Sequence, residues 1–283
     1  MTTLQRMACV LGLMAAVALA AGAQAPSASP LGATPAKREP ISDNSFLIEE
    51  AYNQDPGVVQ HISVFQRPRS GDGWGYTFTQ EWPLGGQRHQ ISYTVPYSSL
   101  GARTTGFGDL LVHYRIQALA DDKAGTFIAP RLSLVLPTGD YKKGLGTGVV
   151  GLQALVPVSH ELTDEIMSHS NVGATFLPSA KDPLGKTGTS TTFLLGQSFI
   201  WLAQPRLNVM LETLWTSTTR KVGTIGSTAI TTYISPGVRW GYDFASGLQV
   251  VPGIAFPIGV GASRGDDQVV VYLSFEHPFT ARR

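Results

Sequence analysis

An alternation of apolar and polar side chains runs through residues 74–97, WGYTFTQEWPLGGQRHQISYTVPY, and it recurs along most of the chain. Trp74, Tyr76 and Phe78 fall on one parity, whereas Gly75 and Thr77 fall on the other. A period of two predicts β-strands. The pattern alone leaves their facing open, because a soluble sheet buries its apolar parity, whereas a membrane barrel turns that parity to lipid and the polar parity to its interior.

Charged residues in the middle of the alternating segments decide between these two structures. Arg115, Arg131, Glu212 and Arg239 all occupy the polar parity. An unpaired charge in a dry core costs several kcal/mol, and a wet barrel interior removes that cost. Only 14% of the residues are charged, against about 25% in ordinary soluble domains. The sequence therefore favours an apolar parity that faces lipid, and a secreted soluble β-sandwich is the weaker alternative.

About twelve alternating segments follow residue 58, each close to the length of a tilted membrane strand. Connectors after even-numbered segments are short, while those after odd-numbered segments tend to be longer, which is typical of outer-membrane barrels with both termini at the short-turn end. We predict an all-β fold, an antiparallel up-and-down transmembrane β-barrel of about twelve strands over residues 58–283, with a short N-terminal helical segment. The expected strands are residues 58–67, 74–82, 87–97, 107–119, 126–137, 148–159, 166–177, 190–202, 207–218, 228–240, 248–260 and 268–279.

The N-terminal residues 1–23 have the features of a secretory signal peptide, with Arg6, an apolar stretch and the small residues Ala21-Gly22-Ala23. The apolar stretch is shorter than the roughly 20 residues that span a bilayer, which disfavours an uncleaved anchor helix. Cys9, the single cysteine, lies inside this segment, so we expect no disulfide in the mature chain. The predicted location is the cell outer membrane, as a multi-pass protein, after cleavage of the signal peptide.

Residues 24–57 are expected to form a periplasmic linker and a short helix. Residues 24–40 are rich in Pro, Ala and Ser, as flexible linkers are. Ser42 or Asp43 is the candidate helix cap, and Asp55-Pro56-Gly57 is the candidate stop. A second hypothesis is that this region folds back as a plug, because residues 190–202 are apolar on both parities and need covering; a miscounted strand is the alternative explanation.

Three stretches of the chain resemble a known family. They are FLIEEAYNQDPGVVQH (residues 46–61), GFGDLLVHYRI (106–116) and LVLPTGDY (134–141). In this order they resemble outer-membrane channel proteins associated with the meta-pathway of phenol degradation, a family similar in layout to the long-chain fatty acid and aromatic hydrocarbon outer-membrane transporters. The resemblance covers most of the mature chain, and it implies a channel for small, often hydrophobic molecules.

Within these motifs we expect turns rather than ligand contacts. Pro137 has no backbone N–H to donate to the strand ladder, so it should end the strand. We expect Gly139 to permit a positive φ in the turn that follows. Gly106 and Gly108 suit a bend where a loop re-enters the barrel. The predicted motif turns are Gly106, Gly108, Asp109, Pro137, Thr138, Gly139 and Asp140.

The charged residues predicted to face the lumen are the only candidate functional site. One interpretation is a set of ion pairs that fills a narrow barrel, which we favour; the other is a constriction that selects permeants by charge and size. The candidates are Glu81, Arg88, Asp109, His113, Arg115, Arg131, Glu212 and Arg239.

The sequence predicts no catalytic residues, no metal site and no cofactor. Ser168 and His169 are adjacent, but neighbours on a strand point to opposite faces. The chain contains no Gly-x-Ser-x-Gly elbow, and its six histidines lack ligand spacing on one face. A net charge of +1 argues against a nucleic-acid partner.

We therefore expect a channel or transporter rather than an enzyme, which conducts small molecules, hydrophobic or aromatic ones among them, by passive diffusion. The alternative is a sealed structural or partner-binding barrel without transport activity. The expected partners are outer-membrane lipid, the barrel-assembly machinery and a small-molecule permeant, and we expect a monomer.

Overall fold

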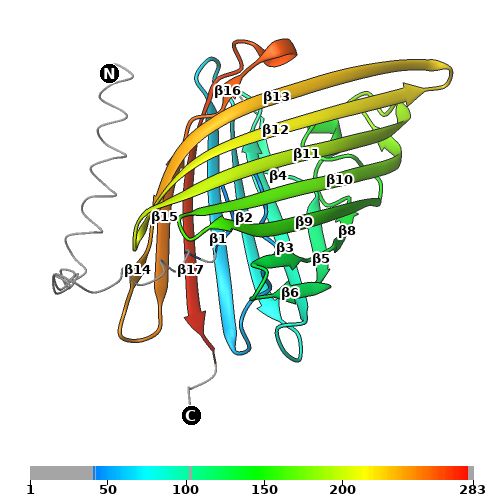
Figure 1. Ribbon diagram of the computed structural model, residues 1–283. Helices are drawn as coiled ribbons and strands as arrows, with labels where there is room; N and C mark the ends of the chain where they lie inside the picture. Colours follow the sequence, from blue (N-terminus) through cyan, green and yellow to red (C-terminus); the bar gives the residue numbers. More distant parts are fainter. Residues whose placement is uncertain (1–40, 42, 102–103, 280–283) are drawn as a thin grey trace, which may run out of the picture. The chain divides into compact units, whose positions relative to one another are not determined.

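The computed structural model describes residues 41, 43–101 and 104–279, and these form a closed antiparallel barrel of twelve strands (Figure 1). The predicted all-β barrel of about twelve antiparallel strands is therefore confirmed. No helix among these residues is long and apolar enough to cross a membrane. The predicted signal peptide and the linker of residues 24–40 lie outside the described residues.

The barrel consists of seventeen paired segments, because several strands are interrupted. β4, β5 and β6 form the fourth strand, β7 and β8 the fifth, and β15 and β16 the eleventh, while β14 continues β13. The elements are β1 (Val58–Pro68), β2 (Trp74–Pro83), β3 (His89–Ser99), β4 (Thr105–Phe107), β5 (Leu110–Ile116), β6 (Leu119–Asp121), β7 (Thr126–Ile128), β8 (Arg131–Leu136), η1 (Tyr141–Lys143), β9 (Gly151–Thr163), β10 (Ile166–Lys181), β11 (Thr187–Gln204), β12 (Leu207–Val222), β13 (Ile225–Trp240), β14 (Tyr242–Asp243), β15 (Gln249–Ala255), β16 (Ile258–Gly259), η2 (Gly261–Ser263) and β17 (Gln268–Pro278).

The first and last strands close the sheet. β1 pairs with β17 over its whole length, from Val58 opposite Pro278 to Pro68 opposite Gln268. Closure satisfies the backbone of both edges, which an open sheet in lipid could not achieve. The start of β1 and the end of β17 consequently lie at the same end of the barrel, which we call the terminal end (Figure 1).

The side chains alternate between the outer and inner faces as the sequence predicts. Leu132 is 56% exposed and its neighbour Ser133 is 1% exposed; Leu211 is 50% exposed and Glu212 is fully buried. The apolar parity thus covers the outside, where it contacts lipid, and the polar parity faces inward. An outer surface this apolar is the surface of a membrane barrel.

Loop lengths differ from the prediction at the end opposite the termini. Residues expected to form long loops after the seventh and ninth strands are instead paired, so that β12 and β13 are joined by Gly223 and Thr224 alone. β10 to β13 have 16 to 18 residues each, more than the roughly 9–11 needed to cross the bilayer. The residues 137–150 and 260–267 do form long connectors. These strands were predicted too short because the local sequence carries no information on cross-strand pairing.

The short helix predicted near residues 42–57 is wrong. Residues 43–57 contain no helix and run as irregular, largely extended chain. The cap and stop signals were present, but backbone N–H groups that would bond within a helix bond instead to side chains of the barrel wall, as described below.

The outward facing of the apolar parity can be tested at Leu211, on the outer face of β12 opposite Phe199 of β11. Replacing it with arginine (Leu211→Arg) places a charge in lipid and should lower the free energy of unfolding by about 2–4 kcal/mol. Leu211→Met is the matched control and should change little. The measurement is denaturant unfolding from lipid vesicles. Equal stability of the two variants would mean that this face of β12 is wet.

Candidate functional site in the barrel interior

The chain that precedes β1 lies against the inner wall of the barrel. We call residue 41 and residues 43–57 the inner segment. Most of its side chains are buried: Ile41, Asp43, Ser45, Phe46, Ile48, Glu50, Ala51, Asn53 and Gln54. Its partners lie near the beginnings of β1, β3, β10 and β12 and near the ends of β5, β9, β11, β13 and β17. The inner segment therefore occupies the half of the barrel nearer the terminal end.

Backbone N–H groups of the inner segment donate to inward-facing side chains. Every second residue from Leu47 to Asn53 donates, as in an extended strand, but no neighbouring strand accepts. Each bond goes to a different strand or connector, so the segment follows the inner wall from one strand to the next. The bonds are Leu47 N to Glu212 Oε1 (2.9 Å), Glu49 N to Asn171 Oδ1 (2.8 Å), Ala51 N to Ser159 Oγ (2.8 Å), Asn53 N to Gln117 Oε1 (3.0 Å) and Gln54 N to Gln90 Oε1 (2.8 Å).

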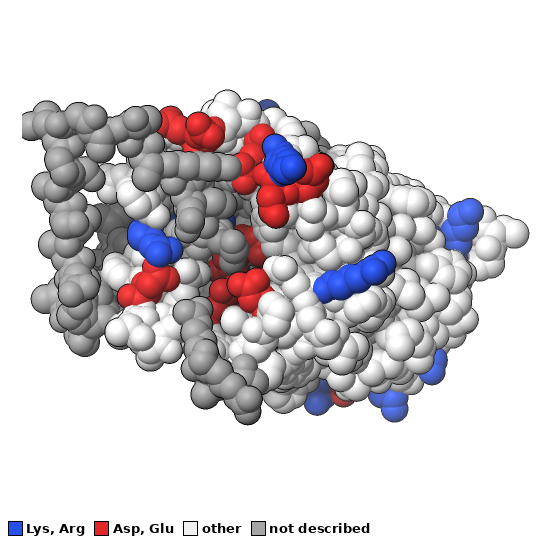
Figure 2. All heavy atoms as spheres, turned by 60° about the horizontal axis from the view of Figure 1, so that its bottom comes forward, with Lys and Arg blue, Asp and Glu red and all other residues white. Residues whose placement is uncertain are grey.

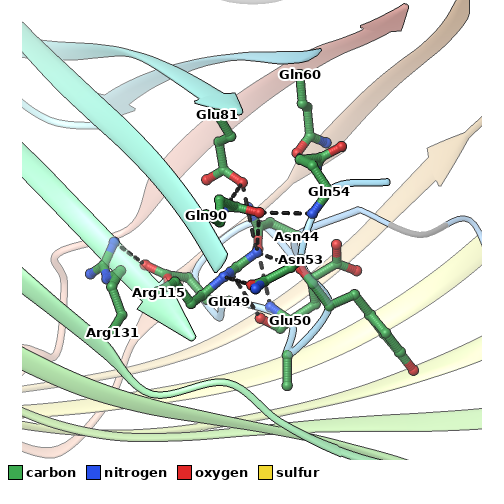
Figure 3. A network of polar contacts seen from close by, with 12 residues as sticks. Asn44, Glu49, Glu50, Asn53, Gln54, Gln60, Glu81, Gln90, Arg115 and Arg131 are labelled. Atoms are coloured by element: carbon green, nitrogen blue, oxygen red, sulfur yellow. Dashed lines mark hydrogen bonds and ion pairs between the residues drawn. The ribbon is translucent and has the colours of Figure 1, made fainter. Parts of the chain in front are cut away.

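Arg115 on β5 is the main polar anchor of the inner segment (Figure 3). It donates to Asn53 Oδ1 at 2.9 Å, to the carbonyl of Glu50 at 3.3 Å and to the carbonyl of Tyr52. Glu81 on β2 lies 3.7 Å from the same guanidinium. Because Arg115 is 2% exposed, its charge depends on these acceptors rather than on bulk water.

Arg239 on β13 holds the other end of the segment. Its guanidinium donates to the carbonyls of Asp43 and Asn44, both at 2.6 Å, and to that of Ile41 at 3.0 Å. Five donors in a planar fork allow an arginine to bind several carbonyls together, which a lysine could not do with the same geometry. Two buried arginines therefore fix the two ends of the segment.

Arg131 and Glu49 form a direct ion pair between the wall and the segment. Arg131 Nη1 lies 2.8 Å from Glu49 Oε1, and Arg131 also donates to Gln153 at 2.7 Å. Both charged side chains are partly exposed. Solvent weakens this pair, so it contributes less than the network at Arg115.

Glycines in the wall accommodate the apolar side chains of the segment. A Cβ at Gly196 of β11 would lie 2.2 Å from Ile48, and one at Gly237 of β13 or at Gly253 of β15 would lie 2.5 Å from Phe46. Phe46 also packs edge-on against Tyr272, with ring centroids 5.7 Å apart. β11, the strand that is apolar on both parities, is thus covered on its inner face by the inner segment.

Besides Glu49, the inner segment brings two fully buried carboxyl groups into the interior, those of Asp43 and Glu50. Asp43 Oδ1 accepts from Gln60 Nε2 at 2.8 Å and from the Tyr272 hydroxyl. Burial raises the pKa of Asp43 to about 6 and raises the pKa of Glu50 well above its usual value. Asp43 Oδ2 and Glu50 Oε2 have no hydrogen-bond partner among the described residues. Arg239 lowers the pKa of both groups and Arg115 lowers that of Glu50, but the effect of burial is larger.

The structure brings most of the predicted lumen residues together. Glu81, Arg115, Arg131, Glu212 and Arg239 belong to the network that holds the inner segment. His113 is also inside, where it bonds to Ser133 Oγ at 2.7 Å and to Thr94 Oγ1 at 3.0 Å.

Two of the predicted lumen residues lie outside the network that holds the inner segment. Arg88 lies in the exposed turn between β2 and β3, outside the strands, so its assignment to the lumen is wrong. The turn covers residues 84–88, whereas the alternation placed it at residues 83–86. Asp109 is buried between β4 and β5, where it accepts from Gly139 N at 3.0 Å and from Thr147 N at 2.7 Å. These bonds organise the connector that follows β8 rather than the inner segment.

The motifs at residues 106–109 and 137–140 pack on each other through Asp109. Thr138 Oγ1 donates to the carbonyl of Gly108 at 3.1 Å and accepts from Leu110 N at 2.9 Å. Gly139 does not have the positive φ that we expected. Glycine is required there because a Cβ would lie 2.5 Å from the carbonyl oxygen of Leu145. Asp140 has a turn role, since it caps η1 by accepting from Lys142 N. Gly106 does not, because it lies inside β4, opposite Ser98.

Sequence reasoning missed the neutral polar residues of the network. Gln90, Gln117 and Asn171 have the same inward parity as the charged candidates, so parity could have identified them. A Ser–His pair also escaped attention because its members are on adjacent strands: Ser159 Oγ lies 2.7 Å from His169 Nδ1. Both are almost fully buried, and Ser159 also accepts from the inner segment, so a substrate has no access to this pair while the segment is in place.

Comparisons with known proteins show the same architecture. No protein-family model matches the chain, and no curated protein matches it. The solved structure of the COG4313 outer membrane channel from Pseudomonas putida F1 superimposes with a TM-score of 0.63 at 12% sequence identity, covering 81% of this chain and 98% of that chain. The two chains therefore share the same β-barrel fold. The NanC porin superimposes with a TM-score of 0.49 at 8% identity, covering 78% of this chain and all of that one (100%).

Arg115 offers a direct test of how the inner segment is held. Arg115→Met removes the donors to three acceptors in the segment and leaves Glu81 as an uncompensated buried charge, so stability should fall by about 3–5 kcal/mol. Amide hydrogen exchange of residues 43–57 should become faster.

Two further variants control for other causes. Arg67→Met, at the exposed end of β1, should leave exchange unchanged. Adding Glu81→Gln to Arg115→Met should restore part of the stability, because no unpaired carboxylate then remains. Unchanged exchange in Arg115→Met would exclude Arg115 as the anchor.

Proposed function

We propose that the protein is a channel of the cell outer membrane that conducts small, uncharged molecules, hydrophobic or aromatic ones among them, by passive diffusion. The single observation that carries this proposal is a closed twelve-strand barrel with a lipid-compatible exterior and a polar interior. Likeness of fold to the COG4313 outer membrane channel supports it. A barrel of this size is wider than barrels filled by their own side chains and narrower than general porins.

The interior beyond the inner segment supports an uncharged permeant. Hydroxyl groups pair across neighbouring strands there, at 2.7 Å between Thr79 and Thr94 and at 2.6 Å between Thr216 and Thr231. Leucines occupy the same inward parity, for example Leu194 on β11 and Leu214 on β12. Paired hydroxyls beside aliphatic groups produce little electric field, so a lining of this kind suits neutral, partly apolar molecules better than ions.

We further propose that the inner segment is a plug and that the predicted constriction residues serve to hold it. The observation behind this is the series of hydrogen bonds from the segment to strands around the wall. The same observation supports the alternative of a sealed structural or partner-binding barrel, because a segment that never moves would close the lumen.

Flux measurements on two chains separate these possibilities. The full mature chain and a chain lacking residues 26–56 are compared in planar bilayers and in liposome swelling with neutral aromatic and charged solutes of equal size. A channel with a plug should conduct more after the deletion and should favour the neutral solute. If neither folded chain passes solute, the channel proposal fails; if both conduct equally, only the plug proposal fails.

A single substitution tests the plug without shortening the chain. Gly196→Leu fills the space that holds Ile48 and should displace the segment, raising conductance toward that of the deleted chain. Gly75→Leu is the matched control, because Gly75 is also a strand glycine, yet a Cβ added there would meet no atom within 4 Å. Equal conductance of both variants and the parent would count against a segment seated on β11.

A further inference from the structure

Charged residues at the two ends of the barrel differ in sign. Acidic side chains gather at the terminal end, which faces the viewer in Figure 2. Asp121, Asp122, Asp164 and Asp243 are exposed in or beside its turns. The opposite end carries lysines and arginines in its connectors instead. The two ends of the barrel therefore present net charges of opposite sign to the two leaflets of the membrane.

Six basic residues at the opposite end form one continuous group, which we call the basic rim: Lys142, Lys143, Lys181, Lys186, Arg220 and Lys221. Arg220 donates to the carbonyls of Ala180 and Lys186, both at 3.1 Å. Lys181 lies 5.1 Å from the centroid of the Tyr141 ring, beside Lys142. These contacts join the β8–β9 connector to the ends of β10, β11 and β12.

Acidic residues in this region compensate only part of the positive charge. Asp140 pairs with Lys143 at 3.6 Å, and Asp182 caps its own turn by accepting from Leu184 N and Lys186 N. Asp109, buried against the β8–β9 connector, is a third acidic residue of this region. Six basic and three acidic residues leave a net charge of +3. Asp72, Asp266 and Asp267, the other acidic residues of this end, lie in the β1–β2 and β16–β17 connectors instead.

On the outer face of the barrel, the type of side chain changes from one cross-strand row to the next toward the basic rim. Cross-strand register places Leu195 beside Trp215 in an apolar row, and Thr191 beside Thr219 and Thr228 in a row of hydroxyls. The next row contains Lys221 opposite Thr189. Apolar groups, hydroxyls and ammonium groups thus follow one another along the outside of β11 and β12.

This order of side chains matches the order of chemical groups along one class of lipid. Acyl chains suit the apolar row, sugar hydroxyls suit the hydroxyl row, and phosphate suits the basic row, because ammonium groups bind phosphate as point charges. We propose that the basic rim binds the phosphate groups of a phosphorylated glycolipid in the leaflet at this end of the barrel. The acidic terminal end repels such a lipid.

Native mass spectrometry of the purified full barrel in detergent tests this proposal, with bisphosphorylated lipid A and its dephosphorylated form as probes. The parent should bind the phosphorylated probe more tightly. Lys186→Gln combined with Lys221→Gln should weaken that binding by roughly 25-fold, since each basic residue near an anionic lipid contributes roughly a factor of five. Binding of the dephosphorylated probe should not change.

Lys123→Gln combined with Arg206→Gln, at the terminal end, is the matched control with the same loss of charge, and it should bind like the parent. Heat-modified gel mobility establishes that both variants are folded. Equal affinity of the rim variant and the parent overturns the proposal. So does phosphatidylglycerol binding as tightly as lipid A, because a site for a phosphorylated sugar should distinguish them.

Discussion

Closure of the sheet is the constraint on which the rest of the structure depends. Lipid offers no hydrogen-bond partner to a backbone edge, so the ladder between β1 and β17 must be complete. Once the sheet is closed, strict alternation separates the residues into an outer apolar set and an inner polar set. The inner set then needs partners of its own, because a buried polar group without a hydrogen bond costs free energy.

The inner segment supplies many of these partners. Its carbonyls accept from Arg115 and Arg239, and its N–H groups donate to Glu212 and Asn171. The wall in turn satisfies the backbone of the segment, because an irregular chain inside a barrel has no neighbouring strand with which to form hydrogen bonds. Wall and segment therefore stabilise each other, and the charged residues of the terminal half are explained by the chain that they hold.

The sequence alone predicted the features that depend on local periodicity. Strand number, facing and the inward position of Arg115, Glu212 and Arg239 all follow from alternation. Features that depend on contacts between distant residues were not predictable in this way. Helix signals near Asp43 and Pro56 were real but were outcompeted by side chains of the wall, which no local pattern reveals. Glycines show the same limit: Gly139 was expected to provide a positive φ, whereas it is needed because the Leu145 carbonyl approaches it closely.

The number of bonds to the inner segment determines how often the segment can leave. A typical hydrogen bond contributes about 0.5–1.5 kcal/mol, and one to a charged group contributes about 1.5–3 kcal/mol. The bonds of Arg115 and Arg239 alone therefore suffice to keep spontaneous full release rare, since about 5.5 kcal/mol already separates populations of 1:99 and 99:1. Partial release requires less free energy, because the contacts are arranged in order along the wall. Detaching Ile41 to Asn44 breaks the bonds to Arg239 while those to Arg115 remain, so the two arginines divide the segment into parts that can separate one after the other.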